Sequence, residues 1–513
     1  MNLSKSRYCS AVQCLKMLWL KQNKPEEFDE SAINDAVLKT GNEAGDIAMG
    51  LFGDFTEVPY STNLQEMIDK TKELMDCGTP VIAEASFAYD GAFCSVDILK
   101  NLGKGEVEIY EVKSSTEVKD IYHHDISYQC YVLRKLGYDV KKACLVHINN
   151  SYVRQGELDL QQLFTVEDMT EIVAGMDPGV ERRITIIREY MQNPGEDLPE
   201  IIGLHCSDPY NCGFFKYCTK DLPKPNIFDV ASLRKDKKFK CYYEGIISFE
   251  EIWNSGAITG NHMKQVEFEL KELPPEIDIP RIREFLDTLS YPLYFLDFES
   301  FQPAVPLYDN SRPYEQIVFQ YSLHYIEEQG GQLKHKEYLA YPGEDPRRVL
   351  AEQLCADIPM DVCTMAYSMG FEKMITKGLA ELYPDLKEHL MNIHGNMVDL
   401  MVPFQKKHYY SREMQGSYSI KKVLPALFPD DPALDYSNLE GVHNGGEASA
   451  AFAAMATMNL TELEEWRKHL LEYCKLDTLA MVKIWEKLLE KIEEELCYDG
   501  DKYLRRRRNQ SKR

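Results

Sequence analysis

Two carboxylates and a lysine in one short stretch of the chain have the residue types and spacing for phosphodiester chemistry. The segment 106–113, EVEIYEVK, alternates as a strand does, and this places Glu111 and Lys113 on one face. Asp97, in SVDIL, would lie on the neighbouring strand. Two carboxylates can bind Mg²⁺ or Mn²⁺, and a lysine can neutralise phosphate charge or orient the attacking water. Similar triplets, such as Asp139-Val-Lys141, also occur at solvated strand edges.

A second set of residues has the spacing of a metal or cluster site. Cys206, Cys212 and Cys218 lie within thirteen residues, among Pro, Asn and Gly turn residues. Thiolates bind zinc or iron–sulfur clusters, and either group needs a fourth ligand. Cys14 is the first candidate for that ligand and Cys9 its rival. The sequence therefore predicts either a [4Fe–4S] cluster or a Zn²⁺ site.

A third set of residues is acidic. The apolar run YPLYFLDFES contains Asp297 and Glu299, which would face the same side of a buried strand. Carboxylates buried without a partner are costly, so this strand implies a bound cation. Tyr473 and Asp477 are four apart in LEYCKLDT and would share one face of a helix. Held together, such carboxylates could bind the two metal ions that clamp a phosphodiester during hydrolysis.

Two mixed α/β domains would position these residues. The first is predicted at 1–224, with strands over 80–113, a helix near 119–136, a strand at 141–149 and helix from 166 to 192. Pro- and Lys-rich sequence then predicts a small helical linker module at 225–288.

The second domain is predicted at 289–496, with strands in YPLYFLDFES, QIVFQYSLHYI and KHKEYLAY and a long closing helix over about 461–496. A basic tail, 497–513, follows it.

Composition limits the classes of protein. The 513 residues are 44% hydrophobic and 11% aromatic, values that exclude a largely disordered chain. The net charge of −25 argues against a sheath that coats nucleic acid through a basic surface. We expect a cytoplasmic protein without membrane contact, because no signal peptide or 20-residue apolar span is visible. Singly scattered cysteines such as Cys474 are predicted to be buried as small hydrophobes.

Residues 1–222 resemble the RecB-type branch of the PD-(D/E)XK nucleases, especially the iron–sulfur exonucleases of CRISPR adaptation. The motif residues of this resemblance are Asp97, the Glu111-Val-Lys113 triplet, Gln129 and Tyr131. The segment TGNEAGDIA resembles an upstream helical motif in which Glu43 would be an extra metal ligand. In that family, one N-terminal and three C-terminal cysteines close a structural cluster, which favours Cys14 as the fourth ligand.

Residues 289–496 resemble the ribonuclease-H-like 3′–5′ exonucleases with the DEDD signature. Asp297 and Glu299 match the first motif, and Tyr473-x-x-x-Asp477 matches a tyrosine-type third motif whose tyrosine orients the nucleophilic water. The second motif normally ends in Phe-Asp, but this chain has Phe-Glu there. Either Glu372 or Asp399 would then supply the remaining ligand.

Nearly the whole chain also resembles a bacterial family of unknown function that fuses these two halves. The shared phrases are LSKSRY, YPLYFLDFES, RPYEQIVFQYSLH and GSYSIKKVLP. The two nuclease resemblances together imply a metal-dependent DNA exonuclease with two catalytic centres, which acts on DNA with single-stranded or free ends in repair or defence. RNA is an alternative substrate. A catalytically inactive nucleic-acid-binding protein and a scaffold with structural zinc are the alternative functions.

Overall fold

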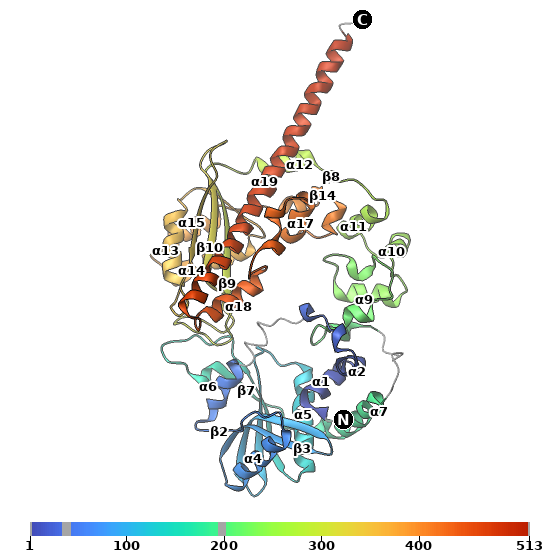
Figure 1. Ribbon diagram of the computed structural model, residues 1–513, viewed down its shortest axis with the longest axis vertical. Coiled ribbons are helices and arrows are strands. Elements are labelled where there is room, and N and C mark those ends of the chain that lie inside the picture. Colours follow the sequence, from blue (N-terminus) through green and yellow to red (C-terminus); the bar gives the residue numbers. More distant parts are fainter. Residues whose placement is uncertain (1–2, 33–42, 193–201, 511–513) are drawn as a thin grey trace. The chain divides into compact units, whose positions relative to one another are not determined.

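The computed structural model describes residues 3–32, 43–192 and 202–510, with side chains described as far as residue 495. The chain forms two compact units. The first unit contains residues 1–221 together with 303–315, and the second contains 222–302 together with 316–513. The mixed α/β class predicted from the sequence is confirmed in both units (Figure 1). No described helix has the length and hydropathy needed to cross a membrane.

A mixed sheet forms the centre of the first unit, with the order β2-β3-β4-β5-β6-β7 and β1 added beside β4. Neighbours are antiparallel from β3 to β5, whereas β5 and β6 are parallel. The strands of this sheet are β1 (Leu3–Ser4), β2 (Thr56–Glu57), β3 (Val81–Tyr89), β4 (Ala92–Gly103), β5 (Glu106–Lys113), β6 (Asp139–Ile148) and β7 (Phe164–Asp168). The predicted strands over 80–113 are confirmed.

Helices cover this sheet and bury a shared core. The helices of the first unit are α1 (Lys5–Gln13), α2 (Leu15–Asn23), α4 (Leu64–Asp76), α5 (Asp120–Lys135), α6 (Leu160–Leu163), α7 (Thr170–Met191) and α8 (Phe215–Cys218). Ile126, Cys130 and Leu133 of α5 are fully buried at helical spacing in this core, which explains why the segment is a helix. The helix predicted from 166 begins later, because 164–168 pairs with β6 as a strand.

A five-stranded sheet with the order β11-β10-β9-β12-β13 forms the centre of the second unit. Strand β9 is central, antiparallel to β10 and parallel to β12. The strands are β9 (Leu293–Phe301), β10 (Ile317–Ile326), β11 (Lys334–Leu339), β12 (Cys363–Ala366) and β13 (Met397–Asp399), and a separate pair joins β8 (Glu276–Ile277) to β14 (Tyr409–Tyr410). Because β9 is covered on both faces, its apolar run has no polar alternation until Asp297.

Several helices of the second unit pack against this sheet (Figure 1). The helices of this unit are α9 (Lys235–Tyr243), α10 (Phe249–Ser255), α11 (Asn261–Leu270), α12 (Ile279–Leu286), α13 (Arg347–Asp357), α14 (Gly370–Leu382), α15 (Lys387–Gly395), α16 (Val402–Gln405), α17 (Ile420–Leu427), α18 (Gly445–Met455) and α19 (Leu460–Gln510). Helix α19 packs along β9 and β10. The predicted long closing helix is confirmed, and it extends to residue 510.

Residues 225–288 fall within the second unit. The segment 227–266 has a small apolar cluster of its own, in which Ile227, Phe249 and Val266 are buried. Phe268 and Ile282 instead belong to the larger core around α19. Residues 511–513 of the predicted basic tail lie outside the described part of the chain.

Candidate functional site

The first site lies at neighbouring strands of the first unit. Ile98 of β4 pairs with Tyr110 of β5, and this register sets Asp97 level with Glu111. The amide N–H of Val112 donates to Asp97 Oδ2 at 2.7 Å. Glu111 is only 1% exposed. The structure therefore brings Asp97 and Glu111 together as two carboxylates on adjacent strands.

Lys113 and Gln129 complete the set of residues indicated by the sequence, and Asp125 joins them. Lys113 Nζ donates to Glu111 Oε1 at 2.6 Å and to Asp125 Oδ2 at 2.7 Å. Gln129 Nε2 donates to Glu111 Oε2 at 2.7 Å and to Asp125 Oδ1 at 2.9 Å. The other amide atom, Gln129 Oε1, is buried and has no donor among the described residues. The sequence motifs do not indicate Asp125, although its spacing of four from Gln129 places both on one helix face.

Lys5 is a further partner that sequence reasoning misses. Its ammonium lies 2.9 Å from each oxygen of Glu111 and 3.3 Å from Asp97 Oδ1. Lys5 is 92 residues from Asp97 along the chain. No local pattern in LSKSRY indicates such a contact, because it depends on how the N-terminal helix packs.

These contacts shift the pKa values of the first site in different directions. Burial and the neighbouring Glu111 raise the pKa of Asp97 to about 6, against the effect of Lys5. Burial also opposes ionisation of Glu111, but Lys113 and Lys5 together hold its pKa well below the usual range. Burial lowers the pKa of each lysine, yet the surrounding carboxylates raise it by more. Two charged lysines thus compensate most of the negative charge in this site.

Two further residues are named by the resemblance. Tyr131 packs against the core of the first unit. Glu43 lies in a helical stretch at 43–48 and is exposed, whereas Glu111 is buried. Residues 40–42 of the same motif lie outside the described residues. Neither Tyr131 nor Glu43 is among the hydrogen-bond partners found for Glu111 in the described chain.

The second site lies where β9 faces α19. One ligand atom from each of Asp297, Glu299 and Cys474 lies within 4.8 Å of the other two. Cys474 Sγ is 3.7 Å from Asp297 Oδ2. Cys474 is buried, as the sequence predicts, but its place in an acidic site is not predicted. It follows from the position of Cys474 three residues before Asp477 on α19.

Asp477 lies in the same electrostatic environment and has an unpredicted tyrosine partner. The hydroxyl of Tyr436 donates to Asp477 Oδ1 at 2.6 Å. Tyr473 is buried, and its ring centroid is 6.1 Å from that of Tyr436. Lys421 Nζ lies 5.1 Å from the Tyr436 ring and 5.5 Å from the Tyr473 ring. Lys421 is therefore the positive charge beside this site, although it forms no ion pair with the site carboxylates in the described residues.

Glu372 and Asp399 have different roles in the structure, although burial and the charge of Asp399 both raise the pKa of Glu372. Glu372, near the start of α14, is buried, and its Oε2 has no donor among the described residues. Its charge contributes to raising the pKa of Asp297 and of Glu299. Asp399 instead accepts backbone N–H groups from Ser368, Met369 and Met401 at 2.9–3.2 Å, and so it anchors the start of α14. Glu372 is the better candidate ligand.

Burial raises the pKa of every carboxyl in the second site. The pKa rises to about 8 for Glu372 and to about 6 for Asp477. For Asp297 and Glu299, burial together with repulsion from Asp477 holds the pKa well above its usual range. This site differs from the first, because no lysine or arginine forms an ion pair with its carboxylates in the described chain. Such a group of acids is suited to bind an added cation.

The cysteine-rich loop adjoins the end of α1. Gln13 Nε2 donates to the carbonyl oxygens of His205 and Tyr210 at 2.8 and 2.7 Å, which holds Cys14 and the loop together. In that loop the N–H of Cys212 donates to the Cys206 carbonyl at 2.8 Å. None of the cysteines forms a disulfide in the described residues.

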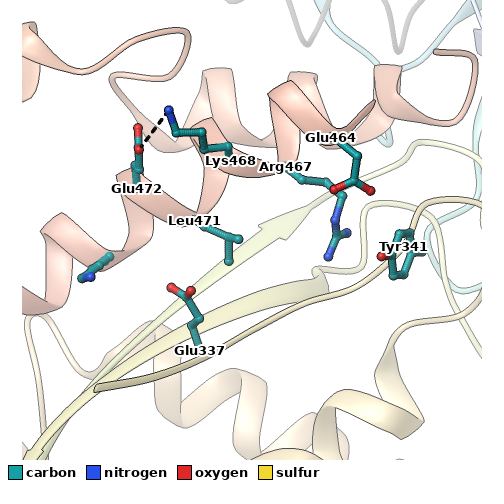
Figure 2. Close-up of a pocket in the computed structure, with 8 residues that line it drawn as sticks. Glu337, Tyr341, Glu464, Arg467, Lys468, Leu471 and Glu472 are labelled. Carbon is teal, nitrogen blue, oxygen red and sulfur yellow. Dashed lines mark ion pairs between the residues drawn. The ribbon is translucent and has the colours of Figure 1, made fainter. Parts of the chain in front are cut away.

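A groove in the second unit lies apart from these sites. Its walls are the first turns of α19 and the end of β11, as Figure 2 shows. Arg467 donates to the carbonyl oxygens of Ala340 and Leu339 at 2.7 and 3.0 Å and stacks over Tyr341 at 4.0 Å. The groove has acidic and basic side chains in equal number, and none of the predicted site residues lines it.

Comparison with known proteins relates the chain to one family and to two bacterial proteins. Residues 294–419 match the family described as Domain of unknown function (DUF2779). Over 232 residues the chain is 30% identical to the uncharacterized protein UU173 of Ureaplasma parvum, covering 41% of this chain and 33% of that protein. Over 293 residues it is 26% identical to the uncharacterized protein MG366 of Mycoplasma genitalium, covering 52% of this chain and 40% of that protein.

The chain thus spans well under half the length of these two relatives. No solved structure matches it. The region that matches the family includes Asp297, Glu299 and Glu372, three of the four carboxylates of the second site.

Proposed function

We propose that the protein is a metal-dependent nuclease that hydrolyses phosphodiester bonds in DNA with single-stranded or free ends. The observation that supports this most strongly is the second site. Asp297 and Glu299 come from β9, and Asp477 comes from α19, yet the three share one buried environment. Uncompensated buried carboxylates are costly, and a divalent cation is the common partner that relieves the cost in nucleases.

The residues present fit such an ion. Oxygen ligands suit Mg²⁺ and Mn²⁺, and the orphaned Oε2 of Glu372 gives a further oxygen to the set. When bound, the metal would lower the pKa of a water molecule and neutralise charge on the phosphate. Tyr473 would orient the attacking water from its position on α19 beside Asp477. Lys421, next to both tyrosine rings, would face the phosphate.

The first site is the second proposed centre. Asp97 and Glu111 would hold metal, and Lys113 would stabilise the charge that develops on the phosphate. The buried, unpartnered Oε1 of Gln129 supports a role for the site beyond internal ion pairing, because such an atom is costly without a donor. Two lysines already compensate this site, so we propose the weaker metal affinity here.

For the cysteine loop we propose an iron–sulfur cluster held by Cys14, Cys206, Cys212 and Cys218. Three of these cysteines lie within thirteen residues of one loop, and Gln13, next to Cys14, donates to the carbonyl oxygens of His205 and Tyr210 in that loop. Thiolates bind iron–sulfur clusters or zinc, so Zn²⁺ is the alternative occupant. The cluster would tie α1 to the end of the first unit and contribute folding energy.

The two sites support the two domain folds that the nuclease resemblances imply. A RecB-like PD-(D/E)XK domain is supported by Asp97 and the Glu111-Val-Lys113 triplet on adjacent strands, followed by Gln129 on the next helix. A ribonuclease-H-like domain is supported by a mixed sheet whose central strand carries Asp297 and Glu299.

The test is degradation of end-labelled single- and double-stranded DNA by the purified chain with Mg²⁺, with Mn²⁺ and with EDTA. We expect cleavage with either metal and none with EDTA. Asp297→Ala and Lys113→Ala would each identify the centre that is responsible. Cleavage that persists undiminished in both variants, or binding of DNA without any cleavage, would contradict the proposal.

A further inference from the structure

Lys5 of the first site is held in place because the chain is fixed on both sides of it, by strand β1 before it and by helix α1, which starts at it. Strand β1 pairs Leu3 with Ala92 of β4, and Leu3 N–H donates to the Gly91 carbonyl at 2.8 Å. Leu3 is fully buried, and its carbonyl accepts from the Tyr128 hydroxyl. Helix α1 begins directly afterwards, at Lys5. The side chain of Lys5 therefore leaves a fixed point beside the sheet.

From that point, the Lys5 ammonium joins the two carboxylates that we propose as metal ligands. It lies 2.9 Å from both oxygens of Glu111 and 3.3 Å from Asp97 Oδ1. The Lys5 side chain is 22% exposed and that of Glu111 is 1% exposed, so this is a partly buried ion pair. Glu111 also accepts from Lys113 and Gln129. Its oxygens are thus fully engaged while Lys5 is in place.

We propose that Lys5 is an internal cation that competes with a divalent metal ion for Asp97 and Glu111. A metal ion would bind these carboxylates only as the ammonium withdraws, because both cations need the same oxygens. The charges agree with an exchange. Asp97, Glu111 and Asp125 face two lysines, so adding a divalent ion beside Lys5 would leave excess positive charge, whereas replacing Lys5 would leave the site neutral.

Among the described residues, no lysine forms an ion pair with the carboxylates of the second site. This contrast predicts different Mn²⁺ affinities for the two sites. The first site should bind Mn²⁺ more weakly than the second. Removing the Lys5 ammonium should strengthen binding at the first site by about tenfold or more. This inference rests on the proposed function only in taking Asp97 and Glu111 as metal ligands, and its tests measure binding and exposure rather than DNA cleavage.

The first experiment is a calorimetric titration of the full chain with Mn²⁺. An Asp297→Asn background weakens the second site so that the first can be followed. Lys5→Met in that background should bind Mn²⁺ at least about tenfold more tightly, whereas Lys5→Arg should keep the weak binding. Lys70→Met is the matched control, because Lys70 pairs with the exposed Glu73 at the surface of the same unit. Unchanged or weaker Mn²⁺ binding in a folded Lys5→Met variant would overturn the proposal.

The second experiment needs no substitution and applies even if Lys5→Met does not fold. Lysine acetylation of the wild-type chain is followed by mass spectrometry with increasing Mn²⁺. Lys5 should become several-fold more reactive as Mn²⁺ fills the first site, while Lys70 should not change. Continued protection of Lys5 at saturating Mn²⁺ would overturn the exchange. A chain that shows the exchange but cleaves no DNA would refute the nuclease proposal and leave this inference standing.

Discussion

Replacing Asp477 by asparagine should stabilise the metal-free protein, although it removes a residue of the proposed active site. Burial raises the pKa of this carboxyl from 3.8 to about 6. At 1.36 kcal/mol per pKa unit, keeping Asp477 ionised costs the folded state about 3 kcal/mol. The asparagine oxygen can still accept the hydrogen bond that Tyr436 donates at 2.6 Å.

The sign of the pH dependence follows from the direction of the shift. An acid whose pKa is raised in the folded state destabilises that state as the pH rises from the unfolded pKa to the folded pKa. For Asp477 this window runs from 3.8 to about 6. Asp477→Asn should therefore raise the free energy of unfolding by about 3 kcal/mol at pH 8, and by little at pH 4.

Calorimetry in EDTA at both pH values measures this difference. The unfolding transition of the second unit should move up by several degrees at pH 8, at about 2–4 °C per kcal/mol. Added Mn²⁺ should stabilise the wild type and not the variant. Glu472→Gln is the control, because Glu472 is exposed on the same helix and pairs with Lys468 at 3.6 Å. A lower or unchanged unfolding temperature of the second unit in Asp477→Asn at pH 8 would show that the ionised Asp477 carboxylate does not destabilise the folded protein.

Three further predictions concern the other predicted residues. Glu372→Gln should weaken Mn²⁺ binding about tenfold or more. Asp399→Asn should leave Mn²⁺ binding nearly unchanged and lower the free energy of unfolding by about 1 kcal/mol, because Asp399 anchors a helix start. Titration with Mn²⁺ measures the binding, and calorimetry measures the stability. Lys113→Ala should lower cleavage by the first centre and leave Mn²⁺ stabilisation of the second unit intact. Cys206→Ala should remove the visible absorption of an anaerobically purified, iron-loaded protein.

For each of these predictions, one result would contradict it. Weakened Mn²⁺ binding in Asp399→Asn, but not in Glu372→Gln, would make Asp399 the ligand. Loss of the calorimetric Mn²⁺ response in Lys113→Ala would mean that the metal binds in the first unit. A colourless wild-type protein that contains zinc would contradict the iron–sulfur cluster and indicate a zinc site.

The strands and the acidic motifs could be predicted from the sequence because their signals are local. Alternation in EVEIYEVK predicts β5 and puts Glu111 and Lys113 on one face, and β5 has the predicted bounds. The apolar run around Asp297 likewise predicts a buried strand, as found in β9. In both cases a few neighbouring residues contain all the information that the prediction needs.

The partners of these residues could not be predicted, because they come from distant parts of the chain. Lys5 reaches Glu111 across 106 residues, and Tyr436 reaches Asp477 across 41. Neither contact follows from periodicity, since each depends on how a helix or loop packs against a sheet. The choice of Glu372 over Asp399 also required the structure, which shows Asp399 bonded to backbone N–H groups.

The position of bound metal tests most directly whether Asp297, Glu299 and Asp477 form a metal site. Crystals of the full chain soaked in Mn²⁺ give anomalous scattering that locates the ion. We expect a strong peak bounded by Asp297, Glu299 and Asp477, and we expect its loss in Asp297→Asn. Manganese bound only elsewhere, with these three carboxylates left without a cation, would contradict this expectation.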